Sequence, residues 1–422
     1  MNKCLLSMAC VRNMRLVFFA AVLFLIAFLV WRITTLHMAD LAFGEEGVRS
    51  NDITNQTLTW NPGHPEALLQ RALSDNDVTH GMRVIQHLVS VLPYDGRLYA
   101  ILAKQYSING EVSLASRVMF IAMLMTPQRT GVQLDAASYW LQQGDIGKGL
   151  GYLDLVLSKD TQSYKHLFPI ILQFLERAES RPLVVELLLR GHSWVNPFLV
   201  YALVNSGEFE LVRAVVERYK SSQTDISWQI QNALVRRLQK ENLWTDAYFN
   251  WLSALSVEQL RYNGYVFNGD FELSPSLSAG GFDWALTKAP GIEVNIIPAA
   301  GFGGSSALNI RFLGLKTPFN HVSQYMVLQP GSYGLAGKVK LDDLKAFKGV
   351  RWVVSCKDGG RVLGVTEAFS GRDDWRSFET TFSVPEKCPV QVLRLELVGR
   401  VALDFQATGG VYFDHIVVKR LD

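Results

Sequence analysis

The stretch Asn268-Gly269-Asp270-Phe271-Glu272 separates two kinds of sequence in this chain of 422 residues. Before it, from Trp60 onward, apolar residues recur with the period of paired α-helices. After it, apolar and polar residues alternate with a period of two, and turn residues follow at short intervals. The stretch therefore predicts a domain boundary near residue 263, and we expect it to form the opening strand and turn of a β-sandwich.

Nine segments of the C-terminal part read as strands, and no helical pattern interrupts them. In the penultimate segment, Leu393, Leu395 and Leu397 share one face, and Arg394 and Glu396 share the other. The nine segments are 294–297, 307–312, 322–328, 333–341, 350–356, 361–366, 378–384, 392–398 and 411–418. We expect roughly ten antiparallel strands that stack as a sandwich over residues 263–422.

The N-terminus predicts a transmembrane helix. Basic residues precede an apolar run over residues 16–36, which is interrupted by Arg32 unless its side chain snorkels to the interface, and acidic residues follow the run. A membrane-spanning helix needs about 20 such residues, and the positive-inside rule places residues 1–15 in the cytoplasm and the rest across the membrane. The alternative is a cleaved signal peptide, although small residues at a plausible cleavage site are missing around residues 37–40. Residues 37–59 carry no clear period and are interpreted as a tether.

The charge balance disfavours one class of function, and the positions of the cysteines predict one disulfide. The net charge is only +2, which disfavours nucleic-acid binding. Cys4 and Cys10 fall on the cytoplasmic side, whereas Cys356 and Cys388 share the oxidising compartment. We expect a disulfide between the latter two.

Residues 60–262 read as paired helices with an internal repeat. Between residues 93 and 157, Gly110 and Gly144 are 34 residues apart, and so are Ala103 and Ala137. Small residues allow close helix packing, and the glycines supply left-handed C-caps. Further helices are expected at 78–92, 167–178, 183–189, 198–204, 209–220, 226–238 and 245–255.

The 34-residue spacing resembles that of tetratricopeptide repeats. The resemblance implies a solenoid of antiparallel helix pairs that binds a partner protein on its concave face. The alternative is a spacer packed only against its own neighbours.

Four motifs are spread over the β region, from its first turn to its last strand. They are Asn268-Gly269-Asp270-Phe271-Glu272 with Gly281-Phe282-Asp283-Trp284, Gln329-Pro330-Gly331-Ser332-Tyr333, Trp375-Arg376-Ser377-Phe378, and Val411-Tyr412-Phe413-Asp414-His415-Ile416. Together they resemble carbohydrate-binding modules of the galactose-binding-like jelly-roll type. One departure is His415, where such modules often have a second acidic residue.

The resemblance implies two kinds of site. Such modules often hold a structural calcium between the first and last strands, which implies Glu272 and Asp414 as ligands, although two carboxylates fall short of the six to eight oxygens required. They bind sugars on aromatic faces helped by planar polar groups. The candidate sugar ligands are Trp284, Phe319, His321, Tyr325 and Trp375, each of which could instead be a packing residue.

No Gly-x-Ser-x-Gly elbow, His-Glu-x-x-His motif or phosphate-binding loop is present, so we predict that the protein is not an enzyme. The combination of parts resembles the membrane-anchored accessory proteins of bacterial exopolysaccharide production and export. It implies a single-pass inner-membrane protein with a periplasmic bulk, whose helices bind envelope proteins and whose β domain contacts glycan. The alternative is an envelope assembly factor whose β domain binds protein or is purely structural, and a glycan-active enzyme is a third, less favoured reading.

Overall fold

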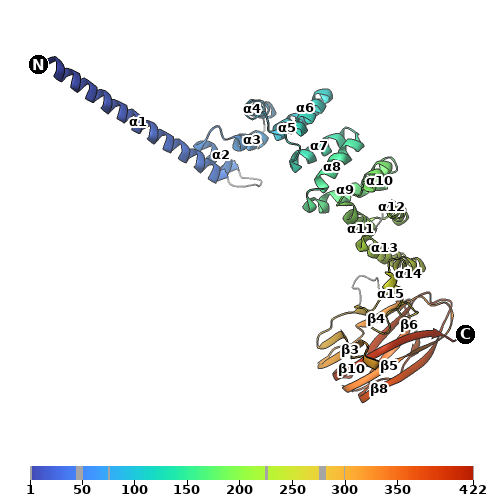
Figure 1. Cartoon of the computed structure of the whole chain (residues 1–422). Helices are drawn as coiled ribbons and strands as arrows, with labels where there is room; N and C mark the ends of the chain where they lie inside the picture. The colour runs from blue at the N-terminus through green and yellow to red at the C-terminus, as the bar shows by residue number, and fades with distance from the viewer. Residues whose placement is uncertain are drawn as a thin grey trace. The chain divides into compact units, whose positions relative to one another are not determined.

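The computed structural model describes residues 2–43, 51–74, 77–223, 227–274, 282–298 and 300–421 (Figure 1). The chain forms two compact units, Met1–Leu167 and Phe168–Asp422. The regular elements in the described part of the first unit are all helices, joined by short turns. The second contains further helices and all the described strands.

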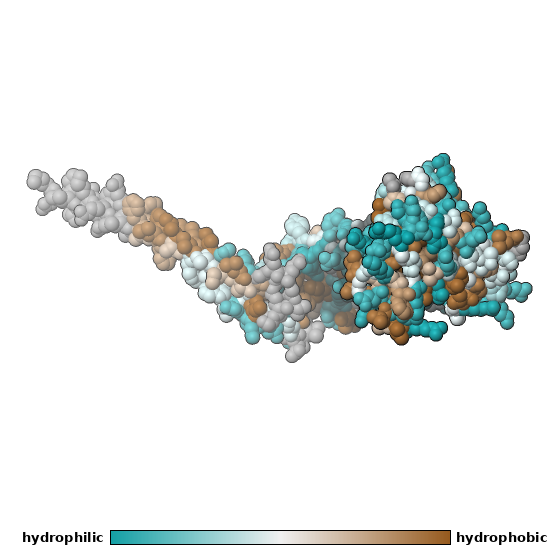
Figure 2. All heavy atoms as spheres, turned by 90° about the horizontal axis from the view of Figure 1, so that it is seen from below, coloured by the Kyte–Doolittle hydropathy of each residue, from teal (hydrophilic) through white to brown (hydrophobic). Residues whose placement is uncertain are grey.

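The first unit begins with a long apolar helix, α1 (Asn2–Phe43). Its segment Phe18–Phe43 is long and apolar enough to cross a membrane, and a signal sequence would have the same properties. Figure 2 shows apolar side chains along the described part of this helix, where large residues such as Phe24 are exposed. The apolar helix therefore ends at Phe43, beyond the expected end at residue 36.

The expected tether at residues 37–59 is mostly helical, which corrects the sequence interpretation. α1 covers its first part, α2 (Asn51–Trp60) covers its last part, and residues 44–50 lie outside the described residues. The buried residues of α2 are Thr54, Thr57 and Leu58. They follow the spacing of one helix face. Because two of the three are threonines, their low hydropathy concealed the helical period.

The repeat in the first unit consists of antiparallel helices, and its glycines end helices as expected. The helices are α3 (Pro65–Ser74), α4 (Val78–Val91), α5 (Gly96–Ile108), α6 (Val112–Met125), α7 (Thr130–Gln142), α8 (Ile146–Leu157) and the 3₁₀ turn η1 (Thr161–Ser163). Gly110 follows α5 with a φ of 81°, and Gly144 follows α7 with a φ of 80°. Ala103 and Ala137 are buried where the helices meet.

The second unit continues the series of helices up to the sandwich. These helices are α9 (Tyr164–Glu176), which begins in the first unit, α10 (Arg181–Leu189), α11 (Val195–Asn205), α12 (Phe209–Ser222), α13 (Trp228–Lys240), α14 (Trp244–Leu252) and α15 (Val257–Leu260). The sequence predicted each of α9 to α14 within a few residues. The predicted start of α13 at residue 226 lies outside the described residues.

The C-terminal part is an antiparallel sandwich of two five-stranded sheets, as the sequence predicted (Figure 1). The first sheet has the strand order β1-β4-β9-β6-β7, and the second has the order β2-β3-β10-β5-β8. The strands are β1 (Ala285–Leu286), β2 (Ile292–Ile297), β3 (Ala307–Lys316), β4 (Val322–Met326), β5 (Gly331–Ala346), β6 (Val350–Cys356), β7 (Val362–Val365), β8 (Gly371–Val384), β9 (Gln391–Leu397) and β10 (Gln406–Arg420). Apolar side chains between the sheets form one core, and Trp352 is fully buried within it.

The stretch from Asn268 to Glu272 forms the expected turn but not the expected opening strand. Asn268 and Phe271 have positive φ values of 52° and 54°, and both are fully buried. The Asn268 carbonyl accepts a hydrogen bond from Trp284 Nε1 at 2.9 Å, and its side-chain oxygen accepts one from the Leu273 N–H at 3.0 Å. Asparagine tolerates this backbone region better than most residues, which suits the position. Alternation over five residues could not exclude a strand here.

The expected disulfide between Cys356 and Cys388 is present. It joins the end of β6 to the segment before β9, with the two Cα atoms 5.5 Å apart. Both cysteines are buried at the edge of the core. The bridge therefore closes one end of the first sheet.

Helix α14 packs on the sandwich within the second unit. The Trp244 ring lies 5.3 Å from the Tyr325 ring on β4, and the Lys357 ammonium lies 4.7 Å above the Trp244 ring. The Trp251 ring lies 5.1 Å from the Phe267 ring. One end of the outer face of the first sheet is thus covered by a helix of the same chain.

Candidate functional site

Two of the expected sugar ligands belong to the core. Trp284 and Phe319 are each 2% exposed. The Trp284 ring packs between Phe271 at 5.2 Å and Trp352 at 5.6 Å. Both side chains are thus closed to a ligand, so the structure corrects the expectation that Trp284 and Phe319 bind sugar.

The two candidates on or beside β4 have partners within the chain. Tyr325 is half-buried against Trp244 of α14. His321 lies 5.6 Å from the ring of Phe319 at an interplanar angle of 31°. Tyr325 lies on β4 of the first sheet and His321 directly precedes that strand, so the structure does not bring them together with Trp375, which lies on β8 of the second sheet.

Trp375 joins a cluster that the sequence did not predict as a whole. Its ring lies 6.4 Å from the Phe302 ring, which is 42% exposed and belongs to the 3₁₀ turn η2 (Phe302–Gly304). Lys338 Nζ lies 4.4 Å above the Phe302 ring, and the His415 ring lies 6.1 Å from it. We call Phe302, Lys338, Trp375 and His415 the aromatic cluster.

A cleft of about 610 Å³ lies beside the aromatic cluster on the second sheet. It is lined by Lys338 and His415 of the cluster together with Glu367, Ser377 and Glu379. Lys338 pairs with Ser377 across β5 and β8, and Lys338 Nζ donates a hydrogen bond of 3.0 Å to Ser377 Oγ. We call this cavity the aromatic cleft. Its walls thus offer ammonium, carboxylate, hydroxyl and imidazole groups beside exposed ring surface.

A β-bulge directs His415 to the cleft. The register between β10 and β5 shifts between Asp414 and Val417, and His415 has a φ of 53°. Bulges leave one residue unpaired and turn its side chain, and they are frequent at binding sites. The positive φ of His415 places its side chain at the cleft, and strained backbone of this kind motivates the hypothesis of a functional site here.

Asp414 holds two members of the aromatic cluster, Phe302 and His415, in position. It is fully buried, and its Oδ2 accepts hydrogen bonds from the Phe302 N–H at 2.8 Å and from Ser305 Oγ at 2.7 Å. Its Oδ1 accepts a hydrogen bond from the His415 N–H at 2.6 Å and lies 3.0 Å from His415 Nδ1. One carboxylate therefore positions both the turn that carries Phe302 and the imidazole of His415.

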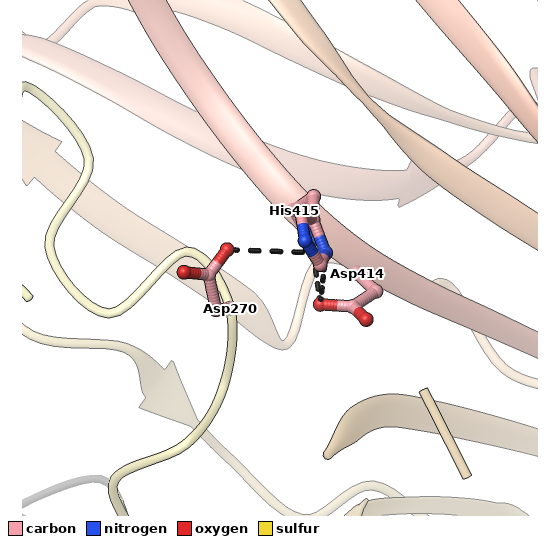
Figure 3. Close-up of side chains that lie close together, drawn as sticks. All are labelled: Asp270, Asp414 and His415. Atoms are coloured by element: carbon pink, nitrogen blue, oxygen red, sulfur yellow. Dashed lines mark hydrogen bonds and ion pairs between the residues drawn. The ribbon is translucent and has the colours of Figure 1, made fainter. Parts of the chain in front are cut away.

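Asp270, Asp414 and His415 form the group of potential metal ligands found among the described residues (Figure 3). Their ligand atoms lie within 4.8 Å of one another, and Asp270 Oδ1 is 3.9 Å from His415 Nδ1. Calcium prefers a shell of oxygens only, whereas this trio includes an imidazole nitrogen and a carboxylate that already accepts several hydrogen bonds. The trio does not fit calcium.

Glu272, the other expected calcium ligand, binds the same turn as Asp414. Glu272 Oε1 accepts a hydrogen bond from the Ser306 N–H at 2.7 Å, next to the Ser305 hydroxyl that binds Asp414. The two carboxylates thus meet N–H and O–H donors of residues 305–306. This is the geometry of a hydrogen-bonded turn, and calcium binding at Glu272 and Asp414 stays a prediction.

The sequence predicted Trp375 as a sugar ligand, which stays a prediction, and it did not single out Phe302, Lys338 or Asp270, which lie close to it or to His415. The available signal was the order Gly301-Phe302-Gly303-Gly304, in which a large aromatic residue stands among glycines. Such a residue cannot be buried by a regular strand or helix of its own. An exposed ring on a loop was therefore the alternative to consider.

No family model matches the chain, and no curated protein is recognisably similar to it. Among solved structures, its C-terminal sandwich is similar to carbohydrate-binding modules. A CBM4 structure shares 18% identity over 37% of this chain and 99% of its own, with a TM-score of 0.28. The CBM22-1 xylan-binding domain of Paenibacillus barcinonensis Xyn10C shares 18% identity over 36% and 92%, with a TM-score of 0.26. TmCBM61, determined with β-1,4-galactotriose, shares 19% identity over 37% and 99%, with a TM-score of 0.26.

Proposed function

We propose that the protein is a non-enzymatic, membrane-anchored scaffold of bacterial exopolysaccharide biosynthesis or export. In this proposal α1 holds the chain in the inner membrane, the helices bind envelope proteins in the periplasm, and the aromatic cleft binds glycan. The observation that carries it is the aromatic cluster beside the cleft: Lys338 and His415 line a cavity with charged and hydroxyl groups, and both contact the Phe302 ring.

The chemistry of the cleft suits a sugar. The C–H faces of a pyranose ring pack on aromatic rings, and its hydroxyls need both donors and acceptors. Lys338 and Ser377 supply donors, while Glu367 and Glu379 supply acceptors. A volume of about 610 Å³ lies within the usual range of ligand pockets.

The helical repeats support the part of the proposal in which the helices bind envelope proteins. On α6, Phe120 is 59% exposed and Leu124 is 58% exposed. Residues four positions apart lie on the same helix face, so the two side chains form a small apolar surface. Such a surface on a tetratricopeptide-like array is suited to a partner protein.

One observation favours the alternative in which the β domain is structural or binds protein. Tyr325, an expected sugar ligand, is used in the contact with Trp244, so the sandwich packs against the last helices. In the alternative, the sandwich would close the helical array and bind no glycan.

The proposal is tested with the full chain in detergent micelles. Affinity electrophoresis and tryptophan fluorescence are measured across a broad panel of purified polysaccharides, with reducing-end release measured in the same samples. Saturable binding without release of sugar supports a glycan-binding scaffold. Absence of binding to every polysaccharide favours the structural alternative, and turnover would overturn the non-enzymatic proposal.

A further inference from the structure

A second, strongly polar cleft lies on the first sheet, away from the aromatic cleft. It has a volume of about 650 Å³ and lies among β6, β9 and the loops at one end of the sandwich. Its lining includes the cationic residues Lys348, Arg351, Arg394 and Arg400 and the carboxylate of Glu396. We call it the basic cleft.

The basic cleft has more cationic side chains than carboxylates that pair with them. Glu396 Oε1 accepts hydrogen bonds from Arg351 Nε at 3.0 Å and Nη2 at 2.9 Å, and Glu396 Oε2 accepts one from Arg394 Nη2 at 3.2 Å. One carboxylate thus serves two guanidinium groups. Its two arginines keep an excess positive charge at the wall of the cleft.

A second carboxylate is used to build the end of the cleft. Asp404 Oδ2 accepts hydrogen bonds from Lys348 Nζ at 2.7 Å and from the Arg400 N–H at 2.8 Å. These bonds hold Lys348 against the turn that carries Arg400, while the Arg400 side chain itself is exposed. With two carboxylates against four cations, the cleft has two positive charges more than negative ones.

One donor of the cleft lacks an acceptor. Among the described residues, Arg394 Nε is a buried side-chain nitrogen without a hydrogen-bond partner. A buried donor in that state costs free energy until an acceptor reaches it. The Arg394 guanidinium, which lines the cleft, thus has a hydrogen-bonding group that no atom of the described chain uses.

We infer that the basic cleft binds the carboxylate groups of an acidic polysaccharide, that is, of a uronic-acid polymer. Guanidinium groups bind carboxylates through paired hydrogen bonds, and Arg394 and Arg400 are the two groups placed to do so. A neutral sugar would need no charge excess. This inference adds a second site and an anionic class of glycan to the proposed function, and it does not depend on the aromatic cleft.

The test uses the full chain in a nonionic detergent and isothermal titration with polygalacturonate, neutral dextran and inorganic phosphate. Polygalacturonate is expected to bind, and its Kd is expected to rise about tenfold or more between roughly 50 and 500 mM NaCl, because salt screens the exposed charges. Arg400→Ala and Arg394→Gln are each expected to weaken binding about tenfold, the loss of one charge-assisted contact. Arg372→Ala removes an exposed arginine from β8 of the second sheet and should change Kd less than about twofold.

The outcomes separate this inference from the proposed function. Equal polygalacturonate binding by the wild type and both cleft variants would overturn the inference, as would variants that raise the Kd for dextran as much as they raise the Kd for polygalacturonate. Phosphate that binds at micromolar concentration and displaces the polymer would show an anion site for free phosphate instead. Loss of neutral-glycan binding in Trp375→Ala with unchanged polygalacturonate binding would support two separate sites. Because Arg400 is exposed, Arg400→Ala remains informative if Arg394→Gln fails to fold.

Discussion

The carbonyl oxygen of Gly269 accepts a hydrogen bond of 2.9 Å from the N–H of Ile416 in the last strand. A Cβ atom at position 269 would lie only 1.9 Å from the carbonyl oxygen of Ile416. Residue 269 is thus in direct backbone contact with β10, beside the bulge at His415. The contact ties the turn at the start of the sandwich to the strand that carries Asp414 and His415.

Gly269→Ala is expected to destabilise the protein, because two backbone segments would have to separate to admit one methyl group. Overpacking of this kind costs about 1–3 kcal/mol of unfolding free energy, and more where only backbone can move. Urea denaturation followed by tryptophan fluorescence measures the loss. Gly207→Ala is the matched control, since a Cβ there meets nothing within 4 Å, and it should change stability by less than about 0.5 kcal/mol. An unchanged midpoint for Gly269→Ala would contradict the contact.

Trp375→Ala and Phe302→Ala are each expected to weaken glycan binding about tenfold. Each removes one aromatic face beside the aromatic cleft, and the loss corresponds to about 1.4 kcal/mol of binding free energy. Titrations with a polysaccharide identified by the binding panel measure the effect. Trp228→Ala, which removes a tryptophan that is 61% exposed on α13, should leave the affinity unchanged. If both variants bind glycan with wild-type affinity, the glycan binds at another part of the protein.

The stability of the sandwich is expected to depend on the ionisation of Asp404. The hydrogen bond from Lys348 lowers the pKa of Asp404 to about 2, below its value of about 3.9 in an unfolded chain. A lowered pKa stabilises the folded state above the unfolded pKa, and this contribution is lost as the pH falls. The difference in unfolding free energy between the wild type and Asp404→Asn should therefore be constant above about pH 5 and shrink between about pH 4 and 2. A parallel series with Asp358→Asn, an exposed residue, provides the baseline, and a pH-independent difference for Asp404→Asn would refute the assignment.

Calcium at Glu272 and Asp414 would raise the melting temperature, because a ligand that binds only the folded state stabilises it by mass action. At a hundredfold excess over Kd the gain is about 2.7 kcal/mol. The full chain is melted with calcium and with a chelator, alongside Glu272→Gln and the control Glu293→Gln from β2. Only Glu272→Gln should abolish the shift. A melting temperature that responds to neither addition removes the calcium site.

The sequence predicted the elements of the fold because their periods are long and regular. The strand expected at residues 350–356 is β6 (Val350–Cys356), and its neighbours differ from the expected limits at their ends. The strand β1 (Ala285–Leu286) is too short to show a period. The conformation of the opening turn escaped prediction for a different reason, because it depends on Asn268 meeting Trp284 and Gly269 meeting Ile416 across the domain.

The candidate site was less predictable than the fold. An aromatic residue in an alternating strand faces either the core or the solvent, and only the pairing of the sheets decides between them. Trp284 and Phe319 face the core, whereas Trp375 lies beside the aromatic cleft. Phe302 contacts Trp375 from a glycine-rich turn held by Asp414, a residue 112 positions away in the chain.

The contact of α14 with the sandwich has a mechanical consequence. Trp244 and Trp251 pack against Tyr325 and Phe267, so the last helices and the β domain share an apolar contact. A pulling force on a polymer bound to the sandwich would be transmitted to these helices through the contact of α14 with the sandwich. A fragment that begins at residue 263 would lack this contact and would expose the apolar surface that α14 covers.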